Sequence, residues 1–152
     1  MKNLIIYISI HHGNTAKVAK AMAEVLNAEL VKVNDVDTTA LSKYDLIGFG
    51  SGMYAKKPHK DLLSLVDRIP VLKKKKAFLF FTSGQDKSDS DRELRERLLA
   101  RGFDIIGAFS CPGWDSWGPL KFFGGIFQGR PSEEDLEKAR NFAQDLLKKL
   151  KA

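Results

Sequence analysis

Seven residues near the start of the chain bring hydroxyl, imidazole and amide groups together around a glycine: Ser9-Ile10-His11-His12-Gly13-Asn14-Thr15. They follow an apolar run at residues 4–8, which is typical of a buried strand. They precede residues 16–27, whose apolar positions recur at helical spacing. A loop between a strand and a helix offers backbone N–H groups at the positive end of the helix dipole, where phosphate binds well. This segment therefore predicts an anion site.

The type of anion is narrowed by what the segment lacks. It has no Walker lysine and no spaced glycines of a dinucleotide fingerprint, so a single terminal phosphate fits better than a nucleoside triphosphate. A simpler alternative is that Asn14 or Thr15 only caps the helix, because both residue types are common helix caps. Two adjacent histidines could also suggest a metal, but His59 is the only other histidine, and we expect no metal site.

The rest of the chain predicts the elements that position this segment. Strands are expected at residues 4–8, 29–33, 45–50, 77–81 and 103–109. Helices are expected at residues 16–27 and 59–68, after a capping box at residues 90–93, and from residue 132, with a short, weakly helical stretch at residues 35–43. Gly102 is expected to end the helix that follows the capping box. Such alternation implies a parallel sheet with helices on both faces. The loops expected at residues 9–15, 51–55, 82–86 and 111–117 then gather at the carboxyl edge of the sheet, where such folds bind ligands.

Length and composition limit the remaining possibilities. The 152 residues suit one domain spanning residues 1–152, and no apolar run approaches the length of a membrane span. A single cysteine, Cys111, suits a reducing cytoplasm. The net charge of +6 favours acidic partners or a weak attraction to anionic surfaces. The lysine run at residues 73–76 is expected to be a solvated turn, and we expect no nucleic-acid binding because no basic stripe with interleaved aromatic residues is present.

Three segments give the chain a resemblance to the flavodoxin family. They are Gly13-Asn14-Thr15 after the first strand, residues 50–54 (Gly-Ser-Gly-Met-Tyr) after the third, and Thr82-Ser83-Gly84 after the fourth. The resemblance covers nearly the whole chain. It implies a flavodoxin-like three-layer α/β/α sandwich with a five-stranded parallel sheet of order 2-1-3-4-5. It also implies a non-covalently held FMN.

The same resemblance assigns residues to the cofactor. The phosphate would contact Ser9, His11, His12, Gly13, Asn14 and Thr15. The isoalloxazine ring would lie between Ser51, Gly52, Met53 and Tyr54 on one side and Thr82, Ser83 and Gly84 on the other. Tyr54 is the aromatic residue best placed to stack on the ring. Its alternative role is that of a half-buried tyrosine at the entry to a helix.

The chain also departs from the usual family pattern. Histidines replace hydroxyl residues before Gly13, the chain is basic, and no aromatic residue follows the fourth strand in the expected loop. Residues 111–118 form an additional segment, which could lend Trp114 or Trp117 to the flavin pocket or to a partner surface. The alternative is a loop held in place by buried indoles. Cys111, at a strand end, is expected to be a buried, small apolar residue.

These features favour an FMN-dependent electron carrier that works with redox partner proteins, without a catalytic side chain of its own. One alternative is an enzyme on the same fold, either an FMN-dependent reductase of quinones or small molecules or a protoporphyrinogen oxidase-like protein. A further alternative is a flavodoxin-like module that has lost its flavin and only binds partners. Bound yellow FMN in the purified protein would exclude this last possibility.

Overall fold

The computed structural model describes residues 1–9, 13–54, 57–83, 91–112 and 130–151. The strands are β1 (Asn3–Tyr7), β2 (Glu29–Lys32), β3 (Leu46–Tyr54), β4 (Lys57–Pro58), β5 (Lys75–Ser83) and β6 (Phe103–Pro112). The α-helices are α1 (Asn14–Leu26), α2 (Lys60–Asp67), α3 (Arg92–Ala100) and α4 (Glu133–Lys151). Two 3-10 helices, η2 (Val33–Asp35) and η3 (Thr38–Lys43), occupy the stretch expected to be weakly helical.

Five strands pair in parallel in the order β2-β1-β3-β5-β6. This confirms the predicted order 2-1-3-4-5, since β5 and β6 are the fourth and fifth parallel strands. The short strand β4 was not predicted. It pairs antiparallel with the end of β3, where Met53 lies opposite Pro58.

The expected strand ends were too early at three places. Residues 51–54 were expected to be a loop, but they continue β3, because Gly52 pairs with Thr82 and Tyr54 pairs with Lys57. Strands β5 and β6 likewise extend to a pair between Ser83 and Pro112. The start of α1 also differs, since Asn14 and Thr15 belong to its first turn and not to the preceding loop.

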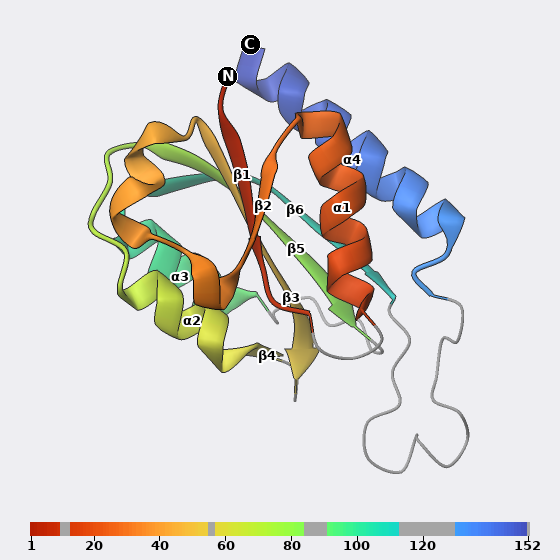
Figure 1. Cartoon of the computed structure of the whole chain (residues 1–152), viewed down its shortest axis with the longest axis horizontal. Helices are drawn as coiled ribbons and strands as arrows, with labels where there is room; N and C mark the ends of the chain where they lie inside the picture. Colours follow the sequence, from red (N-terminus) through yellow and green to blue (C-terminus); the bar gives the residue numbers. More distant parts are fainter. Residues whose placement is uncertain (10–12, 55–56, 84–90, 113–129, 152) are drawn as a thin grey trace.

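The helices form a layer on each face of the sheet (Figure 1). Helices α1 and α4 lie side by side on one face, and α2 and α3 lie together on the other. Alternate strand residues supply the two cores. Toward α1 and α4 the buried side chains include Ile5, Val18, Met22, Phe78, Phe80, Ala139, Ala143 and Leu146, and toward α2 and α3 they include Ile6, Phe49, Leu62, Val66, Leu79, Leu94 and Leu98.

Two glycines of β3 allow the central strands to pack closely. A Cβ atom on Gly48 would lie 2.2 Å from Cζ of Phe78, and one on Gly50 would lie 2.0 Å from Cζ of Phe80. The two phenylalanine rings are stacked, with centroids 6.0 Å apart, in the core beneath α1 and α4. The missing side chains at positions 48 and 50 therefore make room for the rings of β5.

Gly102 follows α3 and adopts a left-handed conformation, with φ 88°, as expected for a glycine that ends a helix. The N-cap residue of α3 is Asp91, and its side chain makes no capping hydrogen bond. Ser90, the cap residue of the predicted capping box, lies outside the described residues, so the box stays a prediction. The lysine run was only partly a solvated turn. Lys75 begins β5, and its Nζ donates to the carbonyl oxygens of Ser42, at 2.9 Å, and Tyr44.

None of the helices in the described part of the chain has both the length and the hydropathy that a membrane span requires.

Candidate functional site

Two threonines join the start of α1 to the end of β5. Oγ1 of Thr15 lies 2.9 Å from Oγ1 of Thr82, and these residues are only 2% and 4% exposed. The strand register then places Gly52 of β3 on one side of Thr82 and Cys111 of β6 on the other. Residues from all four segments that the sequence predicted to meet at the carboxyl edge of the sheet are therefore adjacent.

No described residue crowds the backbone at Gly13, at the start of α1. Gly13 is the N-cap residue, with φ 67°, and a Cβ atom placed on it would have no heavy atom within 4 Å among its described neighbours. The hydroxyl oxygen of Ser9 accepts a hydrogen bond from the backbone N–H of Ala16, at 3.1 Å. Ser9 thus supports the first turn of the helix, and its own proton can still be donated to a ligand.

The charges around this helix end favour an anion. The first turn of α1 contains no acidic residue, whereas Asp61 lies in the first turn of α2 and Glu93 in that of α3. The first turn of α4 carries three carboxylates. Because no carboxylate in its own first turn offsets the positive end of the α1 dipole, an anion bound there is stabilised. Hydroxyl and N–H donors with no carboxylate in the same helical turn suit a phosphate group.

On the β3 side, the Ser51 hydroxyl is already used within the protein. Ser51 is fully buried; its Oγ donates to the Gly52 carbonyl oxygen at 2.5 Å and accepts from the His59 backbone N–H at 3.0 Å. His59 in turn caps α2, because its Nδ1 accepts the backbone N–H of Asp61 at 3.0 Å. Sequence reasoning missed this capping role of His59. These bonds fix the end of β3 relative to the start of α2.

The other predicted ring contacts are placed only in part. Met53 is half-buried and packs on the core toward α2 and α3. Tyr54 pairs with Lys57, and Ser83 pairs with Pro112, through the backbone. The side chains of Tyr54 and Ser83 lie outside the described part of the structure. The predicted contacts His11, His12, Gly84 and Trp114 lie outside the described residues. Their roles, and the alternatives given for Tyr54 and the two tryptophans, remain predictions.

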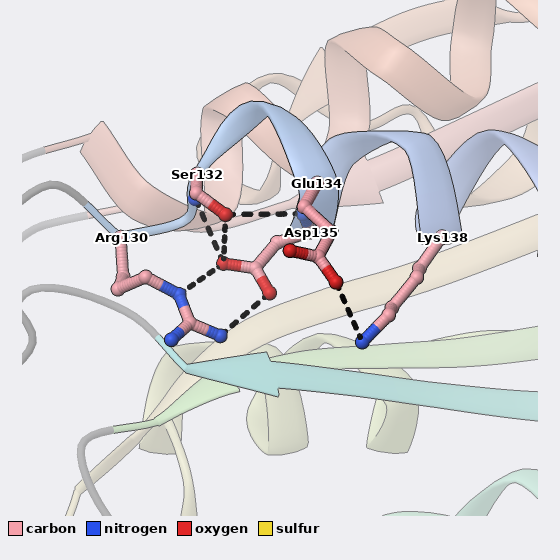
Figure 2. Close-up of polar contacts among 5 residues, drawn as sticks. All are labelled: Arg130, Ser132, Glu134, Asp135 and Lys138. Carbon is pink, nitrogen blue, oxygen red and sulfur yellow. Dashed lines mark hydrogen bonds and ion pairs between the residues drawn. The ribbon is translucent and has the colours of Figure 1, made fainter.

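A cluster of polar residues lies between the end of β6 and the start of α4 (Figure 2). The Asp135 carboxylate accepts hydrogen bonds from both Nε and Nη2 of Arg130, the latter at 2.7 Å. It also accepts from the backbone N–H of Ser132, at 2.7 Å, and from its hydroxyl, at 3.0 Å. In return Ser132 Oγ accepts the Asp135 N–H, at 3.2 Å. The three-residue spacing of Ser132 and Asp135 is a capping-box signal that could have revealed this contact.

The cluster influences two ionisable groups. The hydrogen bond from Arg130 lowers the pKa of Asp135, and the bonds from Ser132 lower it further. Burial raises the pKa of the Cys111 thiol to about 12, and the nearby Asp135 charge adds to this effect. Cys111 is 7% exposed, which confirms the prediction of a buried residue. Among the described residues, no group of three or more His, Cys, Asp or Glu side chains is arranged to hold a metal ion.

A family model described as a flavodoxin domain matches residues 4–110, which is more than half of the chain. The chain belongs to the flavodoxin family. The matched region includes Thr15, Ser51 and Thr82 and ends before Trp114.

One relative covers nearly the whole chain, and solved flavodoxin structures share its fold. An uncharacterized protein of Methanocaldococcus jannaschii is 45% identical over 150 residues, covering 97% of this chain and 99% of the relative. A flavodoxin from the domain Archaea is 17% identical with a TM-score of 0.68, and both chains are covered completely. Oxidised flavodoxin 1 from Bacillus cereus is 22% identical with a TM-score of 0.73, over 97% of this chain and 98% of that one.

A third solved structure is a flavoprotein from Lactobacillus acidophilus in complex with FMN. It is 21% identical, with a TM-score of 0.60, over 72% of this chain and 92% of that chain. At such identities the structural likeness shows the fold, so the predicted flavodoxin-like architecture is confirmed.

Proposed function

We propose that this flavodoxin-family protein binds FMN non-covalently and carries electrons through it between redox partners. The main support for this proposal comes from the arrangement of residues at the start of α1. This helix end has Gly13 as its N-cap, where no described residue would crowd a Cβ atom, no acidic residue in its first turn, and a buried Thr15 hydroxyl beside the end of β5. These features suit the dianionic phosphate of FMN.

The proposed roles of the residues follow from their places around this edge. The phosphate is held by the residues before and within the first turn of α1, which are Ser9, His11, His12, Gly13, Asn14 and Thr15. The ring lies between the β3–β4 hairpin, with Gly52, Met53 and Tyr54, and the end of β5, with Ser83 and the following Gly84. Ser51 supports the hairpin through the hydrogen bonds of its hydroxyl with the Gly52 carbonyl oxygen and the His59 backbone N–H. FMN supplies the redox chemistry, and the protein binds and orients it.

The charge of the protein suggests what kind of partner it meets. With 25 basic and 19 acidic residues, the net charge of +6 attracts acidic redox proteins. Electron transfer to such a partner should slow as salt is added, because the Debye length falls from about 10 Å at 0.1 M to about 3 Å at 1 M ionic strength. An electron-transfer rate that does not change with the salt concentration would contradict the acidic-partner proposal.

The experiment that tests the function separates binding from electron transfer. The purified protein is examined for a flavin spectrum, and the flavin-free protein is titrated with FMN and with riboflavin. We expect stoichiometric FMN, tighter binding of FMN than of riboflavin, and rapid re-oxidation of the reduced protein by an acidic redox protein. Multiple-turnover NAD(P)H oxidation with a quinone acceptor would instead indicate a reductase. Failure to bind FMN would overturn the proposal.

A further inference from the structure

The pair Thr15 and Thr82 contains one more hydroxyl proton than their mutual contact uses. Each threonine hydroxyl carries one proton and can accept at its lone pairs. The 2.9 Å contact between the two oxygens uses one proton, and either oxygen could be its donor. Within the described residues no acceptor receives the second proton, although both residues are more than nine-tenths buried. A buried donor without an acceptor is costly, which points to a ligand that supplies the acceptor.

The position of the two residues selects the direction of the hydrogen bonds. Thr15 is the second residue of α1, at the positive end of its dipole, whereas Thr82 lies within the sheet between Gly52 and Cys111. Resting on the proposed function, we propose that Thr82 is a positioning residue for the phosphate of FMN. Its hydroxyl donates to Thr15 Oγ1, and the Thr15 hydroxyl then donates to a phosphate oxygen.

Two physical effects make this arrangement effective. A hydroxyl that accepts a hydrogen bond becomes a stronger donor, because bonds in a chain polarise one another. Thr82 is also a rigid anchor, since its β-branched side chain has few rotamers and its strand is paired on both sides. The hydroxyl of Thr82 therefore fixes where the Thr15 proton points. This role differs from the ring contact that the family resemblance assigned to Thr82.

The test is a double-mutant cycle with two ligands. Flavin-free wild type, Thr15→Val, Thr82→Val, Thr82→Ser and the Thr15→Val/Thr82→Val double variant are each titrated with FMN and with riboflavin, which lacks the phosphate. From the usual strength of hydrogen bonds to charged groups, Thr15→Val should weaken FMN binding by about 10- to 100-fold. Thr82→Val should weaken it by about 3- to 10-fold, the effect of a neutral hydrogen bond.

The inference is tested by how the affinities for FMN and riboflavin change across these variants. Riboflavin affinity should stay nearly constant in every variant, Thr82→Ser should restore FMN affinity, and the double variant should bind FMN as Thr15→Val does. A loss of riboflavin affinity equal to that of FMN in Thr82→Val would overturn the inference, because Thr82 would then contact the ring or only support the fold. Additive effects of the two single variants, or no effect of Thr82→Val, would also overturn it.

Failure of the proposed function gives a different result. If the wild type binds FMN but transfers no electrons, the cycle still decides the role of Thr82. If the wild type binds no flavin, inorganic phosphate is used as the probe, with the thermal midpoint of the protein as the readout. Stabilisation by phosphate that is lost in Thr15→Val and reduced in Thr82→Val supports the hydroxyl chain without FMN. No stabilisation of the wild type by phosphate overturns it.

Discussion

The hydroxyl oxygen of Ser51 lies 3.0 Å from the backbone nitrogen of His59 and thereby joins the end of β3 to the start of α2. The same hydroxyl donates to the carbonyl oxygen of Gly52. Because Ser51 is completely buried, water cannot replace either bond. The edge of the sheet that we assign to the flavin ring is therefore held from within the protein.

The first prediction is that Ser51→Ala destabilises the protein by about 1–3 kcal/mol, the usual cost of leaving buried polar groups without a partner. The free energy of unfolding in urea measures this loss. Ser64→Ala is the matched control, because Ser64 is exposed on α2. Equal stability of the two variants would show that the Ser51 hydroxyl does not hold this junction.

The second prediction concerns the pH dependence given by Asp135. Arg130 and Ser132 lower the pKa of this carboxyl in the folded protein. Its contribution to stability is therefore complete above the unfolded pKa, which is about 3.9, and is lost as the pH falls through the lower folded value. Asp135→Asn should cost about 1–3 kcal/mol at neutral pH. The difference from the wild type should shrink below about pH 4.

Urea unfolding of the wild type and of Asp135→Asn at neutral pH and in acid checks this expectation. Asp145→Asn is a suitable control, because Asp145 lies on the same helix with its side chain 70% exposed. The control should change stability little at either pH. A difference between Asp135→Asn and the wild type that stays constant into acid would argue that the carboxylate charge contributes nothing.

The third prediction is that the Cys111 thiol is unreactive in the folded protein. Burial raises its pKa to about 12, and the thiolate is the reactive form. At pH 8, labelling with a disulfide reagent should be roughly 10³-fold slower in the folded protein than in the urea-unfolded protein. Asp135→Asn should speed the labelling, since the Asp135 charge helps to raise this pKa. Fast labelling of the folded wild type would refute the prediction.

The fourth prediction tests the close packing of β3 against β5. Gly50→Ala should destabilise the protein by about 1–3 kcal/mol, because the new methyl group would overlap the ring of Phe80. Adding Phe80→Leu should recover part of this loss. Gly107→Ala is the milder comparison, since a Cβ there would lie 3.1 Å from the ring of Phe142. A Gly50→Ala variant as stable as the wild type would contradict the packing described.

The sequence by itself determined the alternating strands and helices, because apolar periodicity reports which faces are buried. Gly102 was recognised as a helix end from its place after α3, and the order of the parallel strands followed from the family resemblance. The sequence also predicts an anion site before α1, because its groups are adjacent in the chain, and this site stays a prediction. These features depend on short stretches of sequence and on elementary geometry.

Only the tertiary structure decided which polar groups meet. Thr15 and Thr82 are 67 residues apart in the chain, and no local pattern indicates that their hydroxyls pair. The strand ends at residues 51–54 were read as a loop because their polar, glycine-rich composition resembles a turn, whereas pairing with β4 and β5 makes them strand. Pairing depends on which backbone lies alongside, and that is set by the packing of the whole sheet.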